Sequence, residues 1–155
     1  MPSSVKLSDV IEQLELQSEE FEAFFNKKTG EFILINTDYI CIVEDGEDTS
    51  DHPAWEQEAI EEVREFLDTQ EDHIALPTKF EIHEYRIMER FCQTLPQENV
   101  REAMCNGLQG RGAFRKFRDN LRRYGIEDDW YRYLGEAHKE IAVAWCEDNG
   151  ITYTP

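Results

Sequence analysis

The chain has 155 residues, of which 16 are Lys or Arg and 34 are Asp or Glu, so its formal net charge is −18. This excess of acid excludes a generally basic coat on nucleic acid and a protein that coats anionic membranes through its charge. Hydrophobic residues make up 40% of the chain and charged residues 32%, a balance typical of a soluble folded protein. The length favours a single domain, residues 1–155, with one sizeable core.

The compartment expected from the sequence is the cytoplasm. No run of about 18 apolar residues occurs, and the segment Met1–Lys6 lacks the apolar stretch of a secretory signal. The four cysteines form no CxxC pair, so buried, reduced thiols are expected at Cys41, Cys92, Cys105 and Cys146. The sequence therefore predicts no metal, no cofactor and no membrane association.

The first part of the chain has the pattern of a short helix followed by a small antiparallel sheet. A helix is expected from about residue 8, with Ser8 as its cap. Alternating residues over 19–26 and an apolar run over 32–35 predict two strands, joined by an Asn- and Gly-containing hairpin turn. Residues 39–43 are expected as a third strand, and because a single hairpin is marginal in water, the sheet needs a third strand or a helix to cover it.

An acidic stretch separates this region from the first long helix. Residues 44–51 carry alternating carboxylates but no register of an EF-hand, so a solvated linker is expected. Residues 53–67 then have the apolar spacing of an amphipathic helix with an acidic face. Ile74–Pro77 is an expected edge strand or extended connector, and Thr78–Glu81 matches a capping box for a helix that continues to Leu95.

Helical spacing dominates the rest of the chain. Pro96 is expected to open the next helix and Gly107 to end it. The apolar stripe of the following helix runs from Phe114 to Tyr124, with Gly125 as the stop. Asp128-Asp129 is expected to cap the last helix, which ends at Asn149-Gly150.

Together these patterns predict an α+β fold, in which a small antiparallel sheet from the N-terminal half packs with a mainly helical C-terminal half. An N-terminal lobe of about residues 1–77 and a helical lobe of about residues 78–151 are expected within the single domain. The sequence shows no internal repeat.

Positive charge is concentrated in one segment. Residues 101–125 hold 7 basic and 2 acidic side chains, net +5, although residues 1–100 hold 7 and 25, net −18. A glycine-containing turn before a basic helix lets backbone N–H groups approach an anion where the helix dipole is positive, and it also suggests a helix-turn-helix. The expected anion-binding residues are Gly110, Arg111, Gly112, Arg115, Lys116, Arg118 and Arg122. Alternatively, these arginines pair with the acidic half of the chain or form a solvated helix face, and the glycines only turn the chain.

Several local motifs resemble those of one family. The segment 110–117 reads GRGAFRKF, Trp130-Tyr131 and Ala144-Trp145 follow it, and Glu84–Met88 precedes it. These motifs resemble the uncharacterised protein family 0158, small bacterial proteins in which an Asp commonly occupies the place of Asn26. The resemblance implies a bacterial cytoplasmic protein and supplies no activity, catalytic residue or cofactor.

Three functions are consistent with the sequence. The first is a non-catalytic interaction or regulatory module, whose acidic surface would attract a basic protein surface. The second is the binding of RNA or a nucleotide phosphate through Gly110–Arg123. The third is an enzyme without a recognisable motif, in which His83, Glu84 or His138 participates. No catalytic residue is predicted, and the aromatic residues Trp130, Tyr131 and Trp145 are expected in the core.

Overall fold

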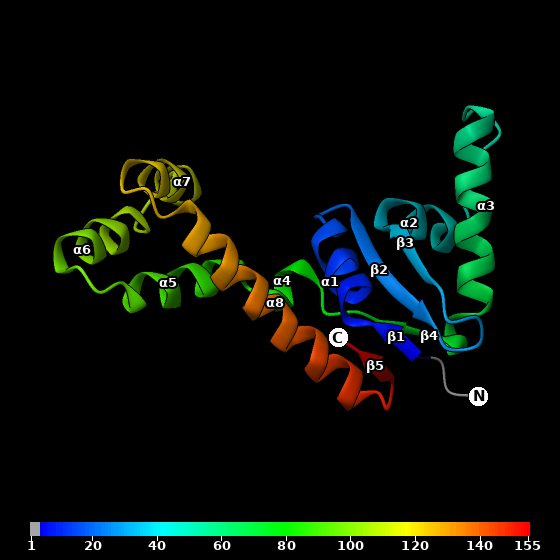
Figure 1. Cartoon of the computed structure of the whole chain (residues 1–155). Helices are drawn as coiled ribbons and strands as arrows, with labels where there is room; N and C mark the ends of the chain where they lie inside the picture. Colours follow the sequence, from blue (N-terminus) through cyan, green and yellow to red (C-terminus); the bar gives the residue numbers. More distant parts are fainter. Residues whose placement is uncertain (1–3) are drawn as a thin grey trace. The chain divides into compact units, whose positions relative to one another are not determined.

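The computed structural model describes residues 4–155, and its fold is α+β as the sequence predicts (Figure 1). A small antiparallel sheet lies in the N-terminal half, and the C-terminal half is mostly helical. The chain divides into two compact units. The first contains residues 4–82 and 141–155, and the second contains residues 83–140.

The sheet of the first unit has the strand order β3-β2-β4, with both pairs antiparallel. Its strands are β2 (Phe21–Asn26), β3 (Phe32–Asn36) and β4 (His73–Ala75). The predicted hairpin is confirmed as β2 and β3, in which Phe24 lies opposite Ile33. The segment expected as an edge strand or connector provides β4, whose Ile74 lies opposite Phe25.

Helices cover both faces of this sheet, because alternate side chains of a strand point to opposite sides. On one face, Ala23 and Phe25 belong to a core cluster with residues from α1 (Leu7–Leu16) and from the last part of α8 (Glu127–Asp148). On the other, Phe24 and Ile35 pack with residues of α2 (Thr37–Asp45) and α3 (Ala54–Asp68). Figure 1 shows α2 and α3 beside the sheet. The amphipathic helix predicted over residues 53–67 is confirmed as α3.

The expected third strand at residues 39–43 is wrong, since this segment lies in helix α2. The Asn36 side chain accepts a hydrogen bond from the Asp38 N–H at 2.9 Å, and Gly46 ends the helix with a φ of 68°. These caps favour a helix over an extended segment. The apolar side chains Tyr39, Ile40 and Val43 have the spacing of one helix face and pack together under the sheet.

The first unit also contains a short parallel sheet, which the sequence did not predict. It pairs β1 (Ser4–Lys6) with β5 (Thr152–Thr154). Helix α1 begins at Leu7 directly after β1, and its N-cap position is Lys6. Ser8 therefore lies inside the helix, and the expected cap at Ser8 is wrong.

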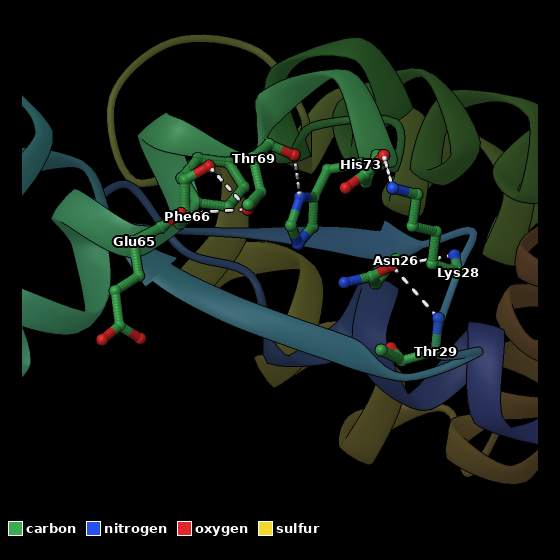
Figure 2. Close-up of polar contacts among 8 residues, drawn as sticks. Asn26, Lys28, Thr29, Glu65, Phe66, Thr69 and His73 are labelled. Atoms are coloured by element: carbon green, nitrogen blue, oxygen red, sulfur yellow. Dashed lines mark hydrogen bonds and ion pairs between the residues drawn. The ribbon is translucent and has the colours of Figure 1, made fainter.

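The hairpin turn is stabilised by the side chain of Asn26, as Figure 2 shows. Its Oδ1 accepts hydrogen bonds from the backbone N–H groups of Lys28 at 2.8 Å and Thr29 at 3.2 Å. Lys28 Nζ lies 3.4 Å from a carboxylate oxygen of Asp72, and His73 Nδ1 donates to the Thr69 carbonyl at 2.9 Å. A side-chain acceptor such as Asn26 Oδ1 can replace a backbone acceptor for the N–H groups of a turn.

We expect Asn26→Ala to lower the free energy of unfolding by about 1 kcal/mol, because two backbone donors lose their acceptor. Asn26→Asp keeps an oxygen at the same place and should change stability by less than about 0.5 kcal/mol. Urea unfolding of the two variants and the parent checks this expectation. Equal loss of stability in both variants would contradict the role assigned to the side-chain oxygen.

All four cysteines are thiols without a disulfide, but only two of them are buried. Cys92 and Cys146 are buried, whereas Cys105 is half-buried and Cys41 is exposed on α2. Burial raises the pKa of the Cys92 thiol to about 12 and raises the pKa of Cys146 above its usual value. The expectation that all four are buried is wrong for Cys41, because its segment is a helix whose apolar face points the other way.

Treatment of the native protein with N-ethylmaleimide at about pH 8 should therefore modify Cys41 first. Cys92 and Cys146 should react only after unfolding, because they are buried and, with raised pKa values, remain protonated at this pH. Peptide mass spectrometry measures the modification of each cysteine over time. Protection of Cys41 as complete as that of Cys92 would show that this face of α2 is covered.

The second unit contains α5 (Glu84–Thr94), α6 (Glu98–Gly107), α7 (Ala113–Arg123) and the first part of α8. Its buried residues include Phe91, Phe117 and Trp130, whose rings contact one another. The last helix begins at Glu127, so Asp128 and Asp129 lie in its first turn, and their expected role as caps is wrong.

The expected helix from Thr78 to Leu95 is interrupted. The capping box is confirmed, since the Thr78 N–H donates to the Glu81 side chain at 3.1 Å and the Glu81 N–H donates to the Thr78 hydroxyl at 3.1 Å. The helix it begins, α4 (Lys79–Ile82), ends at His83, which has a φ of 57°. This left-handed residue cannot continue a right-handed helix, so α5 begins anew at Glu84.

Candidate anion-binding site

Two glycines with positive φ lie in the turn before α7. Gly110 has a φ of 77°, and Gly112, at the N-cap of α7, has a φ of 73°. A Cβ built at either glycine meets no atom within 4 Å, so the backbone conformation, and not lack of space, favours glycine at these positions. The turn reverses the chain so that α7 contacts α6. The expected glycine turn before a basic helix is therefore present in the structure.

One face of α7 anchors it in the second unit. Ala113, Phe117 and Leu121 are buried, and the Phe117 ring lies 4.8 Å from the Trp130 ring and 6.3 Å from the Phe91 ring. A Cβ added at Gly107 of α6 would lie 2.7 Å from the Asn120 side-chain nitrogen. A side chain at Gly107 would therefore require the Asn120 side chain to move.

The basic side chains of α7 lie outside this buried face. Arg115, Arg118 and Arg122 recur at i, i+3 and i+7, which places them on one side of the helix. Lys116 and Arg123 lie at the other edge of the exposed surface, with Asp119 between the two groups. All of these side chains are exposed, as is Arg111 in the turn. We call the group formed by Arg115, Lys116, Arg118, Arg122 and Arg123 the basic face of α7.

No ion pair joins this face to a carboxylate of the described chain. Within residues 4–155 the ion pairs are Lys28–Asp72, His52–Glu56, Arg64–Glu61 and Arg132–Asp129. None of them involves a residue of the basic face or Arg111. The alternative in which these arginines pair with the acidic half of the chain is therefore absent from the described structure. A solvated helix face and an anion-binding face share this geometry, and a binding measurement distinguishes them.

Backbone donors lie at the same end of the helix. The Lys116 N–H donates to the Gly112 carbonyl at 2.9 Å, which closes the first turn of α7. The N–H groups of Ala113, Phe114 and Arg115 precede this bond, and Gly112 supplies no side-chain acceptor. Such donors, together with the positive end of the helix dipole, favour a negative group near Arg111 and Arg115.

The aromatic residues singled out in the sequence divide between core and surface. Trp130 is 5% exposed and Trp145 is 6% exposed, so the expectation that they lie in the core is confirmed. Trp145 Nε1 also donates to the Ala75 carbonyl at 2.9 Å. Tyr131 is 61% exposed, and its expected place in the core is wrong because it lies on the outer side of α8.

The residues considered for catalysis are not gathered in either of two surface grooves. His83 and Glu84 lie at the start of α5, and His138 is buried within α8. A groove of about 370 Å³ is lined by Phe91, Thr94, Leu95, Pro96, Asp129, Arg132, Tyr133 and Glu136. Another, of about 320 Å³, is lined by Ser18, Glu19, Glu22, Thr78, Lys79 and Phe80. Neither groove is lined by a histidine or a cysteine, and sequence patterns did not indicate either one.

Across the described residues 4–155, no group of three or more His, Cys, Asp or Glu side chains is arranged to hold a metal ion. In the same part of the chain, no helix has both the length and the apolar character needed to cross a membrane.

The comparison with known families supports the resemblance in the motifs. The model of the uncharacterised protein family UPF0158 matches residues 2–154. The chain belongs to this family. A curated relative, the UPF0158 protein PA5073 of Pseudomonas aeruginosa, is 35% identical over 66 residues. This match spans 42% of the chain and 43% of the relative. No solved structure matches the chain significantly. The family has no assigned activity.

Proposed function

We propose that the protein is a non-catalytic binding module that uses the basic face of α7 to bind the phosphate groups of a nucleic acid. The main support for this proposal is that the five basic side chains of this face are exposed and form no ion pair with the described carboxylates. Arginine suits this role because its planar guanidinium donates two hydrogen bonds to one phosphate. Four of the five side chains of this face are arginines.

The distribution of charge between the two units limits this binding to one place. Residues 83–140 hold 11 basic and 10 acidic side chains, net +1, whereas the remainder of the chain holds 5 and 24, net −19. A polyanion is attracted by α7 and repelled by the acidic unit. We therefore expect modest affinity that depends strongly on salt, with little tendency to coat nucleic acid nonspecifically.

The test is the salt dependence of binding to a fluorescently labelled uridine oligonucleotide, measured by anisotropy with the full-length chain. Three to five phosphate contacts should give a slope of log affinity against log salt of about −2 to −3.5, because each contact contributes about −0.7 on a single strand. Absence of binding at low salt, or an affinity that is independent of salt, would show that the basic face is only a solvated helix surface and does not bind phosphate.

A second candidate function is the binding of a basic protein surface by the acidic unit. The observation that favours it is a group of exposed glutamates on α3, Glu58, Glu62 and Glu65, which form no ion pair within residues 4–155. Trp55 on the same helix is 66% exposed and lies one helical turn from Glu58. A lysine or arginine of a partner could contact both its ring and the carboxylates.

Capture of polylysine by the full-length chain tests this second function. Trp55→Ala and Glu58→Gln should each weaken the capture, and added salt should weaken it further. Equal capture by the parent and by both variants would contradict a binding surface on α3.

A further inference from the structure

We propose that the nucleic acid bound by α7 is single-stranded and that one of its unpaired bases stacks on Phe114. This inference rests on the binding function proposed for the basic face and specifies the form of its partner. Phe114 is the second residue of α7 and is 51% exposed, whereas Phe117 on the same helix is 2% exposed. Phosphate contacts alone do not explain why a large aromatic ring is half exposed beside several arginines.

The Phe114 ring is held in place from one side. The rings of Phe114 and Tyr85 meet edge to face, with their centroids 6.5 Å apart. Tyr85 is itself fixed, because its hydroxyl donates to the Leu108 carbonyl at 2.7 Å. The ring is therefore partly ordered before any ligand binds, which lowers the entropic cost of stacking a base on it.

The position of Phe114 relative to the arginines suits a strand that follows the helix. Phe114, Arg118 and Arg122 recur at four-residue intervals, so they form one row along α7. Successive members of the row are about 6 Å apart along the axis. This interval is comparable with the separation of neighbouring phosphates in an extended strand. A base on Phe114 would place the following phosphates beside Arg118 and Arg122.

A single strand fits this row better than a duplex. In a duplex the faces of the bases are stacked on one another, so a protein reaches only their edges and the T methyl group. In a single strand the faces are accessible, and proteins that bind such strands combine basic residues with exposed aromatic rings. Any base can stack, so this arrangement predicts weak dependence on sequence.

The experiment compares a labelled 12-nucleotide uridine RNA with an RNA duplex of 12 base pairs, using the full-length chain and its variants. The parent should bind the single strand more tightly than the duplex. Phe114→Ala should weaken single-strand binding about tenfold and leave duplex binding and the salt slope unchanged. Phe114→Tyr should restore the affinity and Phe114→Leu should not, which separates stacking from general packing. Tyr131→Ala, which removes an exposed aromatic residue from α8 in the same unit, is the matched control and should bind like the parent.

Two results would overturn the inference while the binding function stands. One is a duplex affinity equal to or above that of the single strand. The other is that Phe114→Ala binds the single strand as tightly as the parent does, although a separate variant with Arg118 and Arg122 replaced by Glu loses binding. If the parent binds neither RNA at low salt, the proposed binding function fails, and this inference fails with it.

Discussion

Replacement of Arg115 and Lys116 by Glu in the full-length chain should strongly weaken nucleic-acid binding. The double change leaves residues 101–125 with 5 basic and 4 acidic side chains, net +1 in place of +5. The variant carboxylates repel phosphate where the guanidinium and ammonium groups attracted it. We expect the affinity at about 0.1 M salt to fall by at least roughly tenfold, and the salt slope to become shallower by about 0.7 for each lost contact.

Both side chains are exposed, so the double change should leave the fold intact. The matched control is Lys27→Glu with Lys28→Glu, which changes the net charge by the same amount at the hairpin turn of the first unit. Lys28 pairs with Asp72, but its side chain is 75% exposed, and such pairs contribute little to stability. Anisotropy titrations should show loss only for the α7 variant. An equal loss in the control would assign the effect to net charge and contradict a local site.

Phe117→Ala should lower the free energy of unfolding of the second unit by about 3 to 5 kcal/mol. Phe117 is 2% exposed and contacts both Trp130 and Phe91, so its removal leaves a cavity among aromatic rings. Hydrogen exchange resolved by peptide is the measurement, since the two units need not unfold together. The amides of residues 83–140 should lose protection.

Phe114→Ala is the comparison for this prediction, because it removes the same side chain from the same helix at a site that is 51% exposed. We expect it to cost less than about 1 kcal/mol. Similar losses in the two variants would contradict the assignment of Phe117 to the core and Phe114 to the surface. Comparing Phe117→Ala with Phe114→Ala also distinguishes binding lost because the second unit unfolds from binding lost because one contact is missing.

The sequence predicted the parts of the fold that depend on local patterns. The hairpin follows from alternating apolar residues around a turn that contains Asn26 and Gly30, and both the turn and its side-chain bonds are present. Helix α3 follows from apolar residues at helical spacing, and the capping box at Thr78 follows from a four-residue motif. Such patterns are informative because each element must direct its apolar side chains to one core.

Predictions were wrong where a short segment suited two structures. The apolar run at residues 39–43 suits a buried strand or a helix, and the cap at Asn36 selects the helix. Phe114 was expected on the apolar stripe of its helix, but it lies at the edge of the buried face and is half exposed. Its position one turn away from Arg118 was visible in the sequence, yet its exposure depends on the packing of α7 against α5 and α6.

The sequence by itself determined the α+β class, the hairpin, most helices and the concentration of positive charge at residues 101–125, because composition and periodicity are local properties. Only the tertiary structure decided that β1 pairs with β5, that β4 completes the sheet, and that the basic face of α7 lacks ion pairs with the described carboxylates. These features join or separate residues that are distant along the chain. The stability of such strand pairings and ion pairs depends on distances and burial in the folded molecule, and no local sequence pattern specifies these.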